Sequence, residues 1–217
     1  MYFLGDVHQK YTKLNAILET KSPVVQVGDL GFFYPKWLDD YDFRFLAGNH
    51  DNWDVLTTNP PDSYLGRFGF RQYPIPYFFI SGAYSIDYKI RLQQEYTNGQ
   101  KTFWPNEQLS WKEGIDMLDL YGKIKPEVVV SHTCPREVAN IIGNPAVLRA
   151  FGYDPATFTT SQQELLQQAF EFHQPRLWVL GHMHQSISIN VKNTHFRVLS
   201  ELEIVNYYDL LIALKDD

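Results

Sequence analysis

Five short segments of the sequence each carry side chains that can bind a metal ion. They read Gly5-Asp6-Val7-His8, Gly28-Asp29-Leu30-Gly31, Gly48-Asn49-His50-Asp51, Ser131-His132 and Gly181-His182-Met183-His184. Each segment directly follows a short apolar run that is typical of a β-strand. Because ligands of open α/β sheets bind outside the carboxyl ends of the strands, we expect these side chains to converge on one site.

Each segment taken alone has an ordinary structural interpretation. Glycine followed by aspartate is a common turn, since glycine adopts unusual backbone angles and aspartate caps a following helix. Asn49 alone would be a helix cap, and a His-x-His pair in a strand an accident. The set is more specific, because five of the seven histidines fall inside these segments. We interpret the other two, His173 and His195, as structural.

The donor types indicate the chemistry of this expected site. Carboxylate, imidazole and amide oxygen suit divalent ions such as manganese, iron or zinc, whereas a thiolate site would need more cysteines than Cys134. Two such ions about 4 Å apart can clamp a phosphoryl group and lower the pKa of a bridging water for in-line attack. The cysteine is not expected to act as a nucleophile, because no thiol step is needed when a metal supplies hydroxide.

The elements that position these side chains follow from the hydrophobic pattern. Expected strands are Tyr2–Leu4, Val24–Val27, Phe43–Leu46, Tyr77–Ile80, Val128–Val130 and Leu177–Leu180, with later β-type runs at Ser186–Val191, His195–Leu199 and Tyr207–Leu214. Expected helices are Lys13–Thr20, Asn106–Tyr121, Arg136–Ile142 and Ser161–His173. Several strands are nearly continuous in apolar character, which is typical of strands covered on both faces. The pattern predicts an α/β fold in which two mixed β-sheets pack as a sandwich flanked by helices.

Two stretches interrupt this pattern, at about residues 88–105 and 143–160. Both contain Gly, Pro and Asn with little periodicity. Loops of this length in a compact domain are often lids or binding loops, and we expect that role here. No linker or repeat divides the chain, so we expect a single domain over residues 1–217.

The order of the motifs resembles the calcineurin-like metallophosphoesterase superfamily, in particular its small single-domain bacterial and phage members. The resemblance extends from Asp6 to His184 and includes all five superfamily motifs. It implies one metal held by Asp6, His8 and His184, a second held by Asn49, His132 and His182, and Asp29 bridging both. It also implies that His50 is the general acid at the leaving-group oxygen. Gly82-Ala83-Tyr84-Ser85-Ile86-Asp87 is similar to a segment of the small members that forms a central strand under the site.

The sequence departs from the superfamily pattern in two places. Gln9 follows His8 where many members have glycine. The phosphoprotein-phosphatase branch extends its second motif with an Asp and an Arg, and both are missing after Gly31, so a Ser/Thr protein phosphatase is in doubt. His50 would then be oriented by Asp51 or by a backbone carbonyl. Arg91 either meets a substrate phosphate or forms a surface salt bridge.

The composition limits the partners and the location. The chain has 217 residues with a net charge of -6 and no run of Lys or Arg, which argues against a strong nucleic-acid surface. A single cysteine excludes an intrachain disulfide, and no signal peptide or apolar run of ~20 residues is visible. We therefore expect a cytoplasmic protein that does not span a membrane.

These observations predict a phosphoesterase that hydrolyses phosphate mono- or diesters with two divalent metal ions and a histidine acid. Manganese is the expected ion, with iron, zinc, nickel or magnesium as alternatives. The substrate would be a small phosphoester, a nucleotide or a phosphoprotein. Two alternatives stay open at this point: a nucleic-acid-processing phosphodiesterase or nuclease, and a scaffold that keeps the fold without catalysis.

Overall fold

The computed structural model describes residues 1–213 and contains two β-sheets. The first has the order β10-β1-β2-β3, with bounds Ile204–Asn206, Tyr2–Leu4, Val24–Gln26 and Phe43–Phe45. The second has the order β4-β5-β6-β7-β9-β8, with bounds Phe68–Arg71, Tyr77–Ile80, Val128–Ser131, Leu177–Leu180, Thr194–Val198 and Ile187–Val191. Both sheets are mixed, because β10, β4 and β8 are antiparallel to neighbours that otherwise run parallel.

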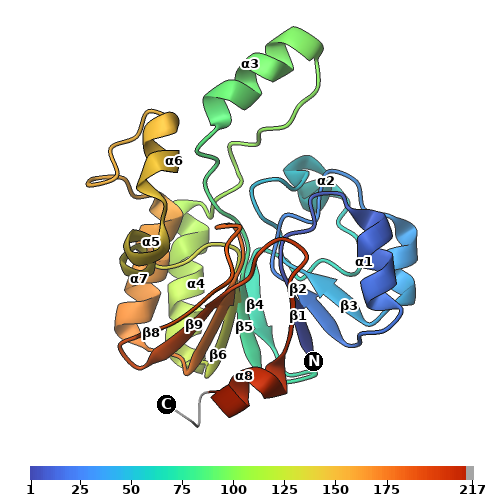
Figure 1. Cartoon of the computed structure of the whole chain (residues 1–217), viewed down its shortest axis with the longest axis vertical. Coiled ribbons are helices and arrows are strands. Elements are labelled where there is room, and N and C mark those ends of the chain that lie inside the picture. Colours follow the sequence, from blue (N-terminus) through green and yellow to red (C-terminus); the bar gives the residue numbers. More distant parts are fainter. Residues whose placement is uncertain (214–217) are drawn as a thin grey trace.

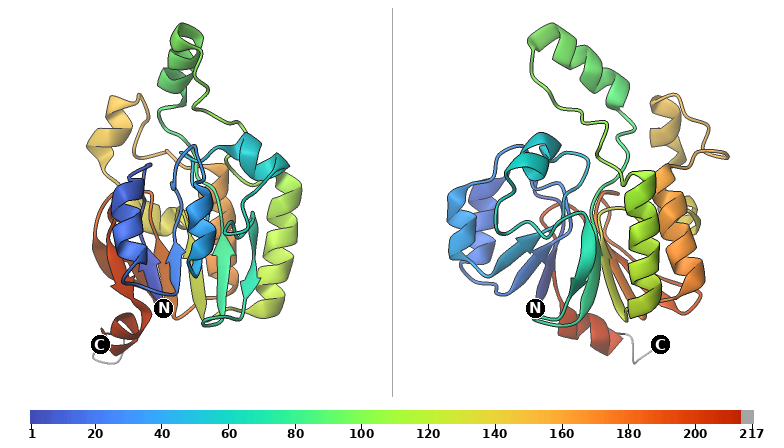
Figure 2. Two further views of the ribbon diagram at one scale, coloured as in Figure 1. Left: turned by 90° about the vertical axis from the view of Figure 1, so that its right-hand side faces the viewer. Right: turned by 180° about the vertical axis from the view of Figure 1, so that it is seen from behind.

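Helices cover the outer face of each sheet, and Figures 1 and 2 show the resulting layers. The first sheet packs against α1 (Tyr11–Leu18), the 3-10 helix η1 (Lys36–Asp40) and α2 (Trp53–Thr58). The second packs against α4 (Trp111–Ile124), α5 (Arg136–Ile142) and α7 (Ser161–Phe172). The predicted two-sheet sandwich with flanking helices is therefore confirmed.

The alternation of strand side chains explains why two sheets can share one core. Val128 and Val130 of β6 pack into the layer between the sheets, whereas Val129 packs toward the helices on the other side. The layer between the sheets also receives Phe3 and Val25 from the first sheet. Since both faces of these strands are buried, nearly continuous apolar runs are what the fold requires.

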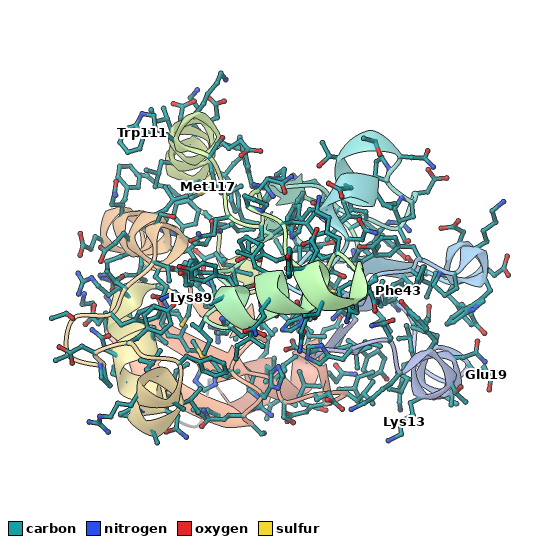
Figure 3. All side chains as sticks on the ribbon, turned by 90° about the horizontal axis from the view of Figure 1, so that it is seen from above. Lys13, Glu19, Phe43, Lys89, Trp111 and Met117 are labelled. Atoms are coloured by element: carbon teal, nitrogen blue, oxygen red, sulfur yellow. The ribbon has the colours of Figure 1, made fainter. Side chains whose placement is uncertain are left out.

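The parallel strands of both sheets end at the same edge of the molecule, which is uppermost in Figure 1. Two helices stand over this edge: α3 (Tyr88–Asn98) and the short α6 (Pro145–Ala150). Seen from above, α3 crosses the middle of the molecule (Figure 3). Both helices belong to the stretches 88–105 and 143–160, which the sequence suggested to be irregular.

Some expected elements are wrong, and each has a local cause. The last β-type run, expected to end at Leu214 outside the described residues, is α8 (Tyr207–Ala213). Its first turn is capped because Tyr208 N donates to Asn206 Oδ1, which favours a helix. Helix α4 begins at Trp111 rather than Asn106, because Ser110 and Glu113 form a capping box.

Elements β4, β10 and α2 were not predicted from the sequence. They are three to six residues long, too short for periodicity to reveal. Within residues 1–213, no helix combines the length and apolar character needed to cross a membrane.

Candidate metal centre

All five predicted segments meet at the shared carboxyl edge of the two sheets. Asp6, Asp29 and Asn49 follow β1, β2 and β3, while His132 and His182 follow β6 and β7. The site therefore lies where the two sheets come together, and each sheet contributes candidate ligand side chains.

The first group of side chains is compact. Asp6, His8, Asp29 and His184 offer ligand atoms that all lie within 4.8 Å of one another. His184 Nε2 is 3.3 Å from Asp6 Oδ2 and 3.1 Å from His8 Nε2. Four donors at such distances, two of them fully buried carboxylates, could hold one divalent ion.

A second group adjoins the first through Asp29. His132 Nε2 lies 3.3 Å from Asp29 Oδ1 and 3.2 Å from Asn49 Oδ1. The ring of His182 lies beside that of His132, with 5.0 Å between their centroids. Asp29 therefore has one carboxylate oxygen facing each group, since its Oδ2 is 3.9 Å from His8 Nε2.

The electrostatics of the site are those of a cation site. Burial opposes the charge of Asp29, but His132, His50 and His8 hold the pKa of this carboxyl well below its usual range. Its Oδ2 is nevertheless buried, with no hydrogen-bond partner in the described part of the chain. A buried, ionised oxygen without a donor is costly, and a bound metal ion would satisfy it. The donor set thus fits a divalent ion.

A backbone carbonyl on the side of the ring away from Asp29 fixes the orientation of His132. Its Nδ1 donates to Val27 O at 2.9 Å, so Nε2 faces the two oxygens of the second group. Burial disfavours the imidazolium, but the charge of Asp29 outweighs burial and raises the pKa of His132 to about 9. Holding one ring nitrogen by a backbone carbonyl is the usual way in which a metal-binding histidine is oriented.

Backbone strain is concentrated in these same loops. His8, Asp29, His182 and His184 have φ angles of 46°, 59°, 64° and 51°, which residues other than glycine rarely adopt. Gly48 is required by a close approach, because a Cβ there would lie 2.1 Å from Asp29 Oδ1 and 2.4 Å from His132 Nε2. Such strain typically clusters at functional sites.

The amide of Asn49 is oriented by a chain of hydrogen bonds that the sequence did not reveal. Asn49 Nδ2 donates to Ser85 Oγ at 3.2 Å, and Ser85 Oγ donates to Glu107 Oε2 at 2.7 Å. Glu107 is buried and also accepts from Ser85 N. Because Nδ2 is committed to Ser85, Asn49 Oδ1 faces the second group.

Asp51 does not orient His50, and this expectation is wrong. Its carboxylate accepts backbone N–H groups from Asp29, Gly31 and Gly48, at 3.0, 2.8 and 2.7 Å. Asp51 is therefore the link that joins the loop after β2 to the loop after β3.

The side chain next to His50 is that of Arg91. Its Nη2 contacts the His50 ring, at 2.9 Å from Nδ1, while Nε donates to Asp87 Oδ2 at 2.8 Å and Nη1 to Asn49 O at 3.0 Å. Arg91 is only 3% exposed and is the buried residue of α3. It is thus neither a surface salt bridge nor directed at the cavity described below.

Burial and the adjacent guanidinium lower the pKa of His50 to about 4, although Asp29 opposes them. In this arrangement the His50 ring is a neutral acceptor for Arg91, since a guanidinium can only donate. His50 also stands edge-on to the ring of His8, at 5.1 Å between centroids. His50 therefore lies next to His8 and lines the cavity described below.

Three other candidates have structural surroundings. Cys134 is fully buried, and burial raises the pKa of its thiol, so it is not a nucleophile. His173 Nε2 is bonded to Pro126 O, and His195 Nδ1 to Asn190 Oδ1. Both histidines are therefore structural, as expected.

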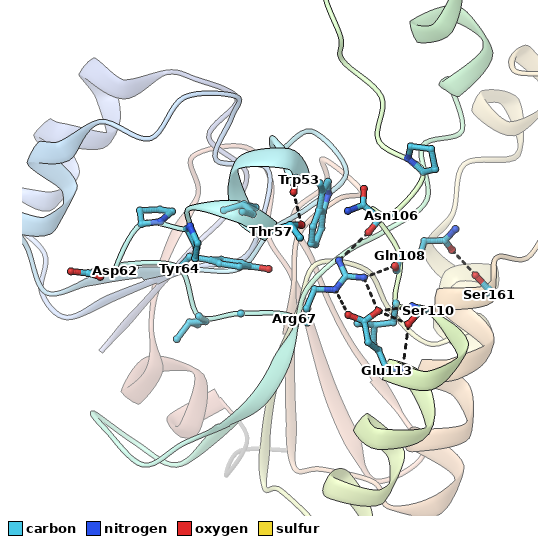
Figure 4. A pocket seen from close by; sticks show the side chains of 17 residues that line it. Trp53, Thr57, Asp62, Tyr64, Arg67, Asn106, Gln108, Ser110, Glu113 and Ser161 are labelled. Atoms are coloured by element: carbon cyan, nitrogen blue, oxygen red, sulfur yellow. Dashed lines mark hydrogen bonds and ion pairs between the residues drawn. The ribbon is translucent and has the colours of Figure 1, made fainter.

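A cavity of about 450 Å³ opens at the ligand cluster and extends to α6. It is lined by His50, His182 and His184 on one side and by residues of 143–160 on another. A larger cavity, about 980 Å³, lies between α2, the segment before β4 and the start of α4, and its lining includes none of the candidate ligand residues (Figure 4). The cation in the larger cavity, Arg67, is bonded to Glu113 and to two backbone carbonyls. The smaller cavity is the one associated with the site, because His50, His182 and His184 line it.

The two-sheet fold and the histidine and carboxylate cluster at its edge define a metal-binding α/β protein. The sequence matches the family of calcineurin-like phosphoesterases over residues 1–186, and the chain belongs to that family. It is therefore a metal-dependent hydrolase of phosphoester bonds.

Two solved structures of named proteins are similar to this chain. Phosphopantetheinyl hydrolase from Mycobacterium tuberculosis is 12% identical with a TM-score of 0.48, over 92% of this chain and 89% of that one. GAP50, the anchor in the inner membrane complex of Plasmodium, is 13% identical with a TM-score of 0.48, over 92% of this chain and 71% of that one. No curated protein matches the sequence significantly.

Proposed function

We propose that the chain hydrolyses small phosphate mono- or diesters at a centre of two divalent ions. One ion would be held by Asp6, His8 and His184, and the other by Asn49, His132 and His182. Asp29 would bridge the two. The observation that carries this proposal is the position of Asp29, whose two oxygens face different ligand groups and whose Oδ2 has no hydrogen-bond partner among residues 1–213.

Bound divalent ions would supply Lewis-acid polarisation of the phosphoryl group and an activated water. The residues of the chain would orient the ions and position the leaving group. His132 and Asn49 are pre-oriented by Val27 and Ser85, so little rearrangement is needed on loading. His50 lines the same cavity, where its ring can meet the leaving-group oxygen. Manganese is the ion that we expect for this mixed donor set.

Metal content of the purified protein tests the number of ions. Protein prepared without chelator and loaded with manganese should approach two ions per chain by elemental analysis. Asp29→Asn should lose at least one ion and most of the activity. Asp40→Asn, at an exposed aspartate, is the matched control and should retain both. Two ions and normal turnover in Asp29→Asn would contradict the bridging role.

A substrate panel tests the reaction. We expect hydrolysis of para-nitrophenyl phosphate, its diester or both when manganese is present. The panel should also contain cyclic nucleotides and dinucleotides, so that it includes natural diesters. Full metal loading without turnover on any ester would instead support a non-catalytic scaffold.

A further inference from the structure

The cavity beside the candidate metal centre has a distinct chemical character. Its wall away from the ligand cluster is apolar and comes largely from α6 and the residues after it: Val147, Leu148, Phe151 and Phe158. Met183, between the two histidines of the last motif, adds a further apolar contact surface. At about 450 Å³ the cavity is in the size range of small-molecule sites.

This wall is held in place rather than loosely attached. Tyr153 packs on Phe158 with 4.6 Å between ring centroids, and its hydroxyl is 3.1 Å from that of Tyr84. Tyr84 follows β5 and therefore belongs to the sheet edge that carries the site. The aromatic contacts thus join the stretch 143–160 to the body of the protein.

Apart from three histidines, the ionisable side chains of residues 1–213 that line the cavity and are charged at neutral pH are carboxylates. Asp29 and Asp87 line it, but among the described residues 1–213 no Lys or Arg does. Buried Arg91 contacts the lining residue His50, but it is otherwise engaged by Asp87, Asn49 and Thr102 and is not itself part of the lining. A second phosphate or a carboxylate on the leaving group would therefore be desolvated without a cationic partner, which is unfavourable.

The polar groups of the outer cavity are neutral amides. Asn140, Asn144, Gln163 and Gln185 contribute them, and they lie among the apolar side chains. Amides donate and accept hydrogen bonds without requiring a charge on the ligand. A mixed apolar and amide lining suits a ring system that carries neutral polar substituents.

We propose that the site selects phosphoesters whose leaving alcohol is uncharged and carries an aromatic ring system of up to about nucleoside size. The single phosphoryl group would lie at the metal centre and the ring against Leu148, Phe151 and Phe158. This inference rests on the proposed function.

Three aryl phosphates with leaving phenols of similar acidity test the selection: phenyl, 2-naphthyl and 4-carboxyphenyl phosphate. With manganese present, kcat/KM should rise from phenyl to 2-naphthyl and fall from phenyl to 4-carboxyphenyl, each by at least ~10-fold. Phe151→Ala should reduce kcat/KM more for the naphthyl than for the phenyl ester. Leu148→Lys should favour the carboxyphenyl ester relative to wild type. Arg149→Ala, exposed on α6 and outside the lining, is the matched control.

The outcomes separate the two proposals. Equal kcat/KM for the phenyl and 4-carboxyphenyl esters would overturn the selection while leaving the phosphoesterase intact. Absence of turnover on all three monoesters and on the para-nitrophenyl diester would contradict the proposed function instead. The cavity is then tested on metal-free protein, by saturation-transfer NMR with 2-naphthol and 4-hydroxybenzoate. Preferential contact with 2-naphthol, lost in Leu148→Lys, supports the selection, and equal or absent contact overturns it.

Discussion

His50 lies between the ligand cluster and a buried guanidinium. Its backbone N–H donates to Asp29 Oδ1 at 2.7 Å, which fixes the residue beside the centre without using its ring as a ligand. Both ring nitrogens contact Arg91 Nη2, and His50 also belongs to the lining of the cavity. An incoming phosphate dianion would favour the protonated imidazole, because a nearby negative charge raises a histidine pKa.

Replacing His50 should separate acid catalysis from metal binding. His50→Gln should retain both ions and lose ~10²–10⁴-fold in kcat on an alkyl phosphoester. The loss should be smaller on a para-nitrophenyl ester, because that leaving group departs with little protonation. His182→Gln, by comparison, should lower metal content and depress both substrates alike. Loss of an ion in His50→Gln, or equal slowing of both substrates, would show that His50 is a ligand or a positioning residue.

Arg91 should act through His50. Arg91→Met should lower kcat on the alkyl ester with little change in KM or metal content, because the side chain holds His50 rather than the substrate. The double variant with His50→Gln should be no slower than His50→Gln alone, since two residues that act as a unit are not additive. Lys89→Ala, exposed on the same helix, is the control. A raised KM with unchanged kcat would instead identify Arg91 as a phosphate ligand.

Glu107 should make stability depend on pH. Burial raises its pKa to about 7 from an ordinary 4.5, although hydrogen bonds from Ser85 oppose the shift. Between these values the folded chain keeps a proton that the unfolded chain has lost, so the unfolding free energy falls as pH rises through this window. In the wild type the unfolding free energy should fall by at most about 3 kcal/mol across this pH window, and Glu107→Gln should abolish that fall. Urea unfolding of metal-free protein from pH 4 to 8 measures it, with exposed Glu127→Gln as control. An unchanged pH slope in Glu107→Gln would contradict the shift.

The loops after the strands, rather than the strands themselves, set the geometry of the centre. The loop after β3 approaches Asp29 and His132 so closely that only glycine is accommodated at residue 48. Asp51 then ties this loop to the one after β2 through three backbone N–H groups. The two loops are therefore one structural unit.

Gly48→Ala should disturb that unit. The new Cβ would lie 2.1 Å from Asp29 Oδ1, so the carboxylate or the loop must move. Metal affinity should then fall by roughly an order of magnitude or more, as it does when a group that orients a metal ligand is lost. Gly122→Ala in α4, where the new Cβ would meet only the exposed ring of Phe172 at 3.1 Å, is the control. Competition with a fluorescent chelator measures the affinity. Wild-type affinity in Gly48→Ala would show that the loop adapts.

At the scale of the whole molecule, the site destabilises the folded chain electrostatically when no metal is bound. Buried carboxylates and converging imidazoles gather at one edge of the sandwich, and none of the described residues donates a hydrogen bond to Asp29 Oδ2. Manganese at a thousandfold excess over its Kd should therefore stabilise the fold by about 4 kcal/mol and raise Tm by roughly 10 °C. Thermal melting with and without chelator measures this, and Asp29→Asn should show a smaller difference. A Tm unchanged after confirmed metal loss would be incompatible with a stabilising metal centre.

The sequence was sufficient for the architecture and for the set of residues at the edge. A side chain at the carboxyl end of a parallel strand lies at the edge where its neighbours also end, so the sequence predicts that Asp6, Asp29 and Asn49 share one sheet edge and His132 and His182 another. The packing of the two sheets then brings these two edges together. The apolar runs specified those strands because both of their faces are buried. Family membership follows from the same motifs.

The partners of His50 and Asn49 could be found only in the folded chain. Arg91 reaches His50 because α3 crosses over the strand ends, and Glu107 reaches Ser85 because the chain after α3 returns to the sheet. Neither contact follows from a local pattern, since 41 residues separate Arg91 from His50 and 22 separate Glu107 from Ser85. The same holds for the apolar wall from α6, whose place at the cavity depends on aromatic contacts with Tyr84. Contacts between distant segments depend on how elements pack, and packing is a property of the whole fold rather than of any stretch of sequence.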